Sequence, residues 1–128
     1  MRRNAQVMVA GVCSALALLA ARRSPAHHSY ALFDGSRHVQ VSGTVRNLEW
    51  GNPHVWLWLV VTDQTGQIVI YAFEGKSIGE MARKSGWTKG TVRYGDRVTV
   101  KYTPFRDGKN GGHMDQVIFA DGHTLTCG

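Results

Sequence analysis

The chain has 128 residues, the length of a single domain, with a formal net charge of +6 and a sequence pI of about 9.8. Much of this charge belongs to the segment 1–26, which holds four of the fifteen basic residues and none of the nine acidic ones. The remainder therefore has eleven basic and nine acidic side chains, a net charge of +2, with the basic residues scattered. This near balance argues against a nucleic-acid partner.

The segment 1–26 predicts an export signal. Arg2 and Arg3 precede residues 7–21, which are apolar or small almost throughout. That stretch is shorter than the roughly 20 residues that span a bilayer, and it matches the apolar core of a secretory signal peptide. We expect cleavage near Ala26, leaving a periplasmic or secreted domain over residues 27–128 with no stable membrane span. An uncleaved anchor is the rival interpretation, because Arg22 and Arg23 follow the apolar core directly.

The two cysteines predict no disulfide. Cys13 lies in the signal segment, so Cys127 is alone in the mature chain and has no internal partner. Because Cys127 is next to the C-terminus, we expect its thiol to be solvated.

The first predicted strand runs from about residue 38 to residue 50. Val39, Val41 and Val45 alternate with polar residues, and the apolar phase then reverses at Leu48 and Trp50. Such a reversal within one long strand is typical of a β-bulge.

A corner at Asn52-Pro53 interrupts the chain, because proline has no amide to donate to a strand ladder. A second strand follows over residues 55–61, and a third over residues 68–74, with a turn at residues 63–66 between them. The two strands therefore form a hairpin.

A short helix follows the third strand. Ser77 and Glu80 have the spacing of a capping box, in which Ser77 accepts from a free amide and Glu80 reaches back. Gly86 fits the left-handed position that ends a helix. Residues 94–102 predict a turn and a fourth strand, residues 104–113 a mobile glycine-rich loop, and residues 114–120 and 123–126 the last two strands.

This order of elements predicts a mainly β fold with one short helix. Three strands, a helix and two or three further strands, with a long bulged first strand, fit a small five- to six-stranded Greek-key barrel of the oligonucleotide/oligosaccharide-binding (OB) type. Small antiparallel barrels of other topologies are the alternative.

Several short motifs in the mature region carry a family resemblance. They are His27-His28-Ser29 followed by Phe33-Asp34, Gly43-Thr44-Val45, Trp50-Gly51-Asn52-Pro53-His54 with Trp56, Gly86-Trp87, Gly95-Asp96 and Asp121-Gly122. With these motifs, residues 27–125 resemble a family of small exported bacterial proteins known as a domain of unknown function. The resemblance implies export and a barrel, and it implies no catalytic residues.

The corner and the second strand predict a ligand-binding surface. His54, Trp56 and Trp58 fall on the face opposite the aliphatic core, and outward tryptophans commonly mark an interface or a ligand surface. The alternative is that the N-terminal segment or the loop at residues 104–113 simply covers these rings. Our first hypothesis is an exported binding or accessory module for an unidentified small ligand or envelope protein, binding through Trp50, Asn52, His54, Trp56 and Trp58.

The histidines at the expected mature N-terminus give a second hypothesis. A chain that begins at His27 offers an α-amine with a reference pKa near 8 and an imidazole on one residue. These groups suit Cu(II), Zn(II) or Ni(II), so copper bound by His27, His28 and His54 is the metal-binding alternative. Against it stand a frayed terminus and a structural His54 that bonds a backbone carbonyl.

Catalysis has the least support in the sequence. The sequence has no triad spacing, phosphate loop or zinc pattern, so we predict no catalytic residue. We expect Glu74 to be a charged residue in solvent at the end of its strand. If it were buried it would need a partner, for which Arg46 and Arg106 are candidates.

Overall fold

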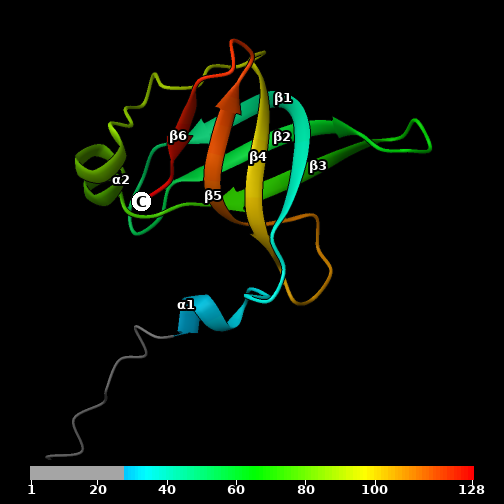
Figure 1. The fold of residues 1–128 in the computed structure, drawn as a ribbon, viewed down its shortest axis with the longest axis horizontal. Helices are drawn as coiled ribbons and strands as arrows, with labels where there is room; N and C mark the ends of the chain where they lie inside the picture. Colours follow the sequence, from blue (N-terminus) through cyan, green and yellow to red (C-terminus); the bar gives the residue numbers. More distant parts are fainter. Residues whose placement is uncertain (1–27) are drawn as a thin grey trace, which may run out of the picture.

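The structure, a computed structural model, describes residues 28–128. The predicted signal segment and His27 lie outside the described residues. The described chain is mainly β, with one eight-residue helix and a single helical turn at its start (Figure 1). In chain order the elements are α1 (His28–Ala31), β1 (Val39–Glu49), β2 (Trp56–Thr62), β3 (Ile68–Glu74), α2 (Ile78–Ser85), β4 (Arg97–Pro104), β5 (Gly111–Phe119) and β6 (Thr124–Thr126).

The strands close into a barrel. They are hydrogen-bonded in the order β3-β2-β1-β4-β5-β6, and a further pairing of β3 with β5 joins five of them into a ring. The β3–β5 pairing is parallel, with residues 72–74 opposite residues 111–113, and the other pairings are antiparallel. With β6 as an extra strand and α2 between β3 and β4, this order confirms the predicted OB-type barrel.

The long first strand is shared between two neighbours. Its residues 39–44 pair with β4 and its residues 44–49 pair with β2. The register with β2 shifts between Val45 and Asn47. This is the β-bulge that the reversed apolar phase predicts, and it bends β1 around the barrel (Figure 1).

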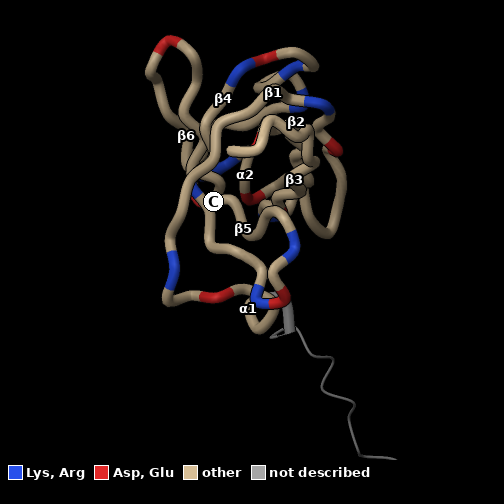
Figure 2. Tube along the Cα trace, turned by 90° about the vertical axis from the view of Figure 1, so that its right-hand side faces the viewer, with Lys and Arg blue, Asp and Glu red and all other residues tan. Residues whose placement is uncertain are grey.

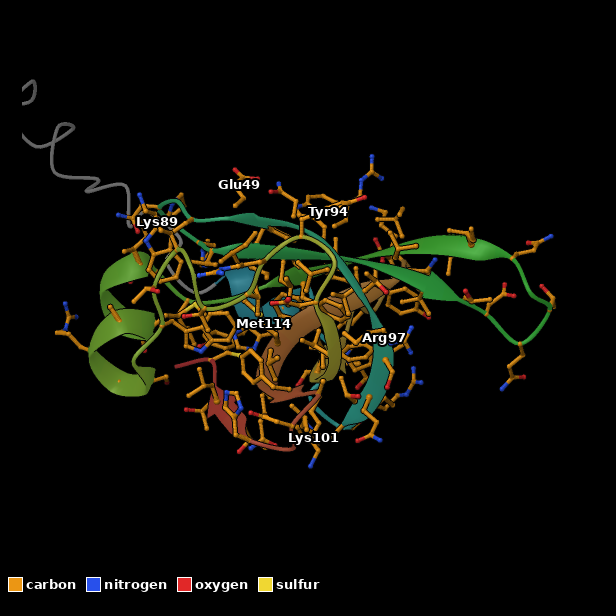
Figure 3. All side chains as sticks on the ribbon, turned by 90° about the horizontal axis from the view of Figure 1, so that it is seen from above. Glu49, Lys89, Tyr94, Arg97, Lys101 and Met114 are labelled. Atoms are coloured by element: carbon orange, nitrogen blue, oxygen red, sulfur yellow. The ribbon has the colours of Figure 1, made fainter. Side chains whose placement is uncertain are left out.

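Alternate strand residues fill the interior of the ring. Leu57, Leu59, Phe73 and Met114 are fully buried, and burial of each side chain of this size contributes roughly 1.5–3 kcal/mol. In Figure 3, Met114 lies within the ring of strands, whereas Lys101 and Tyr94 lie at its periphery. The apolar phases of the sequence therefore identify the core correctly.

The helix α2 begins and ends where the sequence predicts. The Ser77 hydroxyl accepts a hydrogen bond from the Glu80 amide at 3.3 Å, and Gly86 ends the helix with a φ of 70°. The Glu80 carboxylate does not turn back toward Ser77. It accepts a hydrogen bond of 2.7 Å from Lys84, one turn further along the helix, where donor and acceptor are both charged.

The fifth strand begins three residues earlier than predicted. Residues 111–113 belong to β5, so the loop between β4 and β5 is shorter than the predicted segment of residues 104–113. The glycines there permit close contact between backbones: a Cβ on Gly111 would lie 1.9 Å from the Ala72 carbonyl oxygen, and one on Gly112 would lie 2.0 Å from that of Thr103. Sequence reasoning took these glycines as signs of a loop, but they allow the barrel to close.

The expectation of a solvated thiol at Cys127 is wrong. Cys127 is 1% exposed, because β6 and the chain end pack against β5 near Trp87. Burial, with a smaller contribution from the charge of Asp115, raises the pKa of the Cys127 thiol to about 12. The thiol is thus a core group rather than a reactive one.

Within residues 28–128, neither helix has the length and apolar character needed to cross a membrane.

Candidate functional site

The corner before β2 is tied to the start of α2. The Asn52-Pro53 peptide bond is cis, and the Asn52 side-chain oxygen accepts a hydrogen bond of 3.1 Å from the Ile78 amide. The Val55 amide donates to the Lys76 carbonyl, and the Gly75 amide donates to the Val55 carbonyl. Asn52, predicted as a ligand-binding residue, therefore has a structural partner of its own.

His54 lies against a buried carboxylate. Its Nδ1 is 3.0 Å from the Gly75 carbonyl oxygen and 3.1 Å from Glu74 Oε1. Because both neighbours are acceptors, Nδ1 carries a proton and Nε2 of the neutral ring keeps its lone pair. The His54 side chain is 34% exposed, whereas that of Glu74 is 8% exposed. The predicted carbonyl bond of His54 is confirmed.

The expectation of a solvated Glu74 is wrong, and so are the partners suggested for it. Glu74 lies directly opposite Trp56 in the β2–β3 pairing and opposite His113 in the β3–β5 pairing, on the outer face of the barrel. The corner folds His54 against this carboxylate, so a histidine and not Arg46 or Arg106 is its side-chain partner. The alternation of β3 puts Glu74 on the outer face, and the corner that precedes β2 supplies its partner.

A second histidine–carboxylate pair lies on β5. His113 Nδ1 is 3.2 Å from Asp115 Oδ1, and Thr103 Oγ1 donates to Asp115 Oδ2 at 3.1 Å. The His113 side chain is 15% exposed. Its Nε2 is buried without a hydrogen-bond partner. Within residues 28–128, it is the one buried side-chain nitrogen or oxygen atom that lacks such a partner. An orphaned buried nitrogen is uncommon in folded proteins.

Asp115 is held in its charged form. Burial raises its pKa, but hydrogen bonds from His113 and Thr103, with the charges of His113 and His38, lower the pKa below its ordinary value in sum. The carboxylate therefore orients His113 through Nδ1. Sequence reasoning missed His113 because it assigned the residue to a loop.

The outer face beside His113 is covered by residues 28–34, which we call the N-terminal arm. The Asp34 amide donates to the Pro104 carbonyl at 2.8 Å, and the Arg106 amide donates to the Leu32 carbonyl at 2.9 Å. Phe33 is 4% exposed; its ring stacks on Phe105 at 5.3 Å and meets the edge of His113 at 5.6 Å, centroid to centroid. Tyr30 contacts His113 and Lys76.

A cavity of about 440 Å³ lies between the arm, β2 and the β4–β5 loop. Its apolar wall comes from four separate parts of the chain, namely the arm, β2, β3 and the β4–β5 loop, through Ala31, Leu32, Trp56, Ala72 and Phe105. A larger cavity, about 540 Å³, lies beside β1 and β4, but most of its lining residues are polar: His38, Gln40, Lys101, Asp115 and Gln116. The Trp56 cavity is therefore the better match to a small-molecule site, which is mainly apolar with few polar groups.

The predicted ligand-binding residues do not all line one cavity. Trp56 and Trp58 are half-buried and stacked, with ring centroids 6.1 Å apart. Trp56 lines the cavity beside the arm, whereas Trp58 lines a different one, of about 310 Å³, with Arg46, Asn47 and Ile70. Trp50 packs against the edge of the core. Of the five residues, Trp56 alone contributes to the cavity that the arm encloses.

A family model described as "Family of unknown function (DUF6152)" matches residues 15–115. The chain belongs to this family. The matched region of the DUF6152 chain takes in the N-terminal arm, the corner, the buried Glu74 and the His113–Asp115 pair, and it stops before β6. Comparison with curated proteins and with solved structures finds no match.

Of the three metal ligands predicted for the DUF6152 chain, the structure describes the side chain of His54 alone. His27 lies outside the described residues, and His28 begins α1. His54 presents its free Nε2 from the corner. Among residues 28–128, no three histidine, cysteine, aspartate or glutamate side chains are grouped so that they could hold a metal ion.

Charged residues of both signs are interspersed along the DUF6152 barrel. Figure 2 shows lysine and arginine alternating with aspartate and glutamate rather than gathering on one element. The surface of residues 28–128 therefore has no extended field of one sign.

Proposed function

We propose that this protein is an exported binding module that takes a small ligand in the cavity beside Trp56. The observation that carries the proposal is the construction of the cavity. The cavity is lined by Trp56 of β2, by residues of the N-terminal arm and by residues of the β4–β5 loop. A volume of about 440 Å³ falls within the range of small-molecule sites, roughly 300–1,000 Å³.

The arm and the loop support this proposal because they hold each other in place. Two backbone hydrogen bonds and the Phe33–Phe105 ring contact join them, so the walls are formed before a ligand arrives. A preformed cavity loses less conformational entropy on binding than one that must be ordered.

The neutral fluorescent probe N-phenyl-1-naphthylamine tests the proposal. Its emission rises in an apolar site, and we expect saturable binding that weakens about tenfold in Trp56→Ala, since a stacked aromatic contributes about 1 kcal/mol or more. Tyr94→Ala is the control, because Tyr94 is an exposed aromatic residue that does not line this cavity, whereas Trp58 stacks on Trp56 and its replacement would disturb that ring. Absence of saturable binding, or equal loss in both variants, would contradict the proposal.

Export is part of the same proposal and has its own test. The intact mass of protein recovered from the periplasm or medium is expected to correspond to a chain that begins at His27. Recovery of the uncut chain with the membranes would support the anchor instead.

Metal binding is the second candidate function, with copper the first metal to test. The observation that favours it is the orientation of His54: Glu74 and Gly75 hold Nδ1 and leave Nε2 to bind a metal. His27 and His28 would supply the other ligands. Titration of the exported protein with Cu(II) should show weaker binding for His54→Ala and unchanged binding for His123→Ala, a histidine on the β5–β6 turn. Equal affinity in the His54 variant would remove His54 from the site.

A further inference from the structure

The Trp56 cavity has a polar rim that narrows the class of its ligand. Besides its apolar wall, the cavity is lined by Arg106, Asp107, Lys109 and Asn110 from the β4–β5 loop. The balance of charge among these side chains decides whether the rim suits a cation, an anion or a neutral group.

Two of the rim charges neutralise each other. Lys109 Nζ is 3.0 Å from Asp107 Oδ2, and the Lys109 amide donates to Asp107 Oδ1 at 3.1 Å. Among residues 28–128, the one carboxylate that lines the cavity is thus already paired with a cation within its own loop. A cationic ligand would compete with Lys109 for this carboxylate.

Arg106 is the second cation that lines the cavity. Its backbone amide donates to Leu32, and its guanidinium forms no salt bridge with any carboxylate of residues 28–128. The nearby Asp34 accepts two hydrogen bonds from Ser36, at 2.6 and 3.2 Å. These bonds lower the pKa of Asp34 more than the charge of Arg106 does, and Arg106 makes no salt bridge with it. A guanidinium offers several donors in a planar fork that matches the oxygens of a carboxylate, sulfonate or phosphate.

We propose that the cavity takes a molecule with a flat apolar body and one anionic group, the body lying on Trp56 and Phe105 and the anion on Arg106. The inference rests on the proposed function and adds the chemical class of the ligand. The apolar wall favours the body through burial of apolar surface, and the unpaired guanidinium at the rim favours an anion over a cation.

Two probes with one shared body test this inference. 8-Anilino-1-naphthalenesulfonate and N-phenyl-1-naphthylamine have the same aromatic body and differ in the sulfonate. In wild type we expect both to bind. In Arg106→Gln we expect the dissociation constant of the sulfonate probe to rise about fivefold, the size of effect that one partly solvated charge contact gives, while that of the neutral probe stays within a factor of two.

The comparison is made as a ratio, so that differences in solubility between the probes cancel. Arg83→Gln is the matched control, because it removes the same charge from an exposed position on α2, far from the β4–β5 loop in Figure 1. It should leave both dissociation constants unchanged. Raising the ionic strength should weaken binding of the sulfonate probe in wild type and have less effect in Arg106→Gln.

The outcomes separate the two proposals. If neither probe binds in a manner that depends on Trp56, the proposed function fails. If both bind through Trp56 but Arg106→Gln changes both equally or neither, the ligand class is wrong and the binding function stands. Circular dichroism of each variant confirms the fold, and Arg106 is exposed, so its replacement is expected to leave the barrel intact.

Discussion

The buried polar groups on the two flanks of the barrel differ in their hydrogen bonding. On the flank of α2, the indole of Trp87 is 1% exposed and its Nε1 donates to the Thr126 carbonyl at 2.8 Å. On the flank that the N-terminal arm covers, Glu74 is buried against His54, and His113 Nε2 is buried with no partner. On the first flank, the buried indole N–H has a backbone acceptor. On the second flank, a buried imidazole nitrogen has no hydrogen-bond partner.

This difference separates residues that stabilise the barrel from residues available for binding. A buried donor bonded to the backbone contributes to stability, while a buried carboxylate or an unbonded imidazole costs free energy that the fold must offset elsewhere. Departures of this kind from a well-satisfied interior are expected where a protein binds something. The cavity beside Trp56 lies on the same flank.

Replacing Trp87 should give the largest loss of stability. Trp87→Ala removes a fully buried aromatic and its hydrogen bond to Thr126, so we expect the free energy of unfolding to fall by about 3–5 kcal/mol. Urea unfolding followed by circular dichroism measures the change. A loss below about 1 kcal/mol would show that α2 and β6 contribute little to the stability of the barrel.

Cys127 reports whether the α2 flank is closed. With its pKa raised from the ordinary value to about 12, the thiolate fraction at pH 8 is about a thousandfold smaller than for an unperturbed thiol. Iodoacetamide should therefore label Cys127 slowly in the native protein and rapidly in concentrated urea. Fast labelling of the native protein would mean that β6 opens readily.

A Cβ at Gly111 should disturb the pairing of β3 with β5 that closes the barrel. In Gly111→Ala the methyl carbon would lie 1.9 Å from the Ala72 carbonyl oxygen, at a φ of 122°, so we expect a loss of about 3 kcal/mol from strain and overpacking. Gly66→Ala is the control: it also has a positive φ, of 82°, but open space around it, and should cost about 1 kcal/mol. Equal losses would mean that β3–β5 closure tolerates displacement.

The glycines at the start of β5 also show how far the sequence carries a prediction. The alternation in each strand, the reversed phase in β1 and the signals that bound α2 are local, and they predict the barrel and its strand order. Gly111 and Gly112 are different, because the reason for glycine there is a backbone neighbour on another strand, Ala72 on β3 and Thr103 on β4. The sequence pattern shows the glycines and not the contact, so the start of β5 was misplaced.

The site was predicted less well than the fold for the same reason. Trp56 was placed correctly on the outer face, and the carbonyl bond of His54 was expected. The pairing of Glu74 with His54, the burial of His113 and the closure of the cavity by the arm all depend on which segments the barrel brings together. That Arg106 has no salt-bridge partner becomes clear only once the structure shows that Asp107 pairs with Lys109.

Removing His54 should expose the cost of the buried carboxylate. His54→Ala leaves Glu74 buried without its side-chain partner, and because His54 is itself about one third exposed we expect a loss of about 2 kcal/mol, within the range for leaving a buried polar group unsatisfied. Glu74→Gln in the same background should recover part of it. A double-mutant cycle measures the coupling between the two residues, and a coupling near zero would mean that solvent already screens the pair.

The smallest effect, and the one that most sharply tests the contrast between the flanks, is expected at His113. His113→Leu removes the unbonded Nε2 and leaves Asp115 with its bond to Thr103, so we expect the free energy of unfolding to stay within about 1 kcal/mol or to rise. Met114→Ala, at the next and fully buried position of β5, should instead cost about 2–5 kcal/mol. If His113→Leu destabilises the barrel as much as Met114→Ala does, the imidazole is a structural group after all. A stable His113→Leu barrel would show that the fold does not need this histidine, as the contrast between the flanks requires.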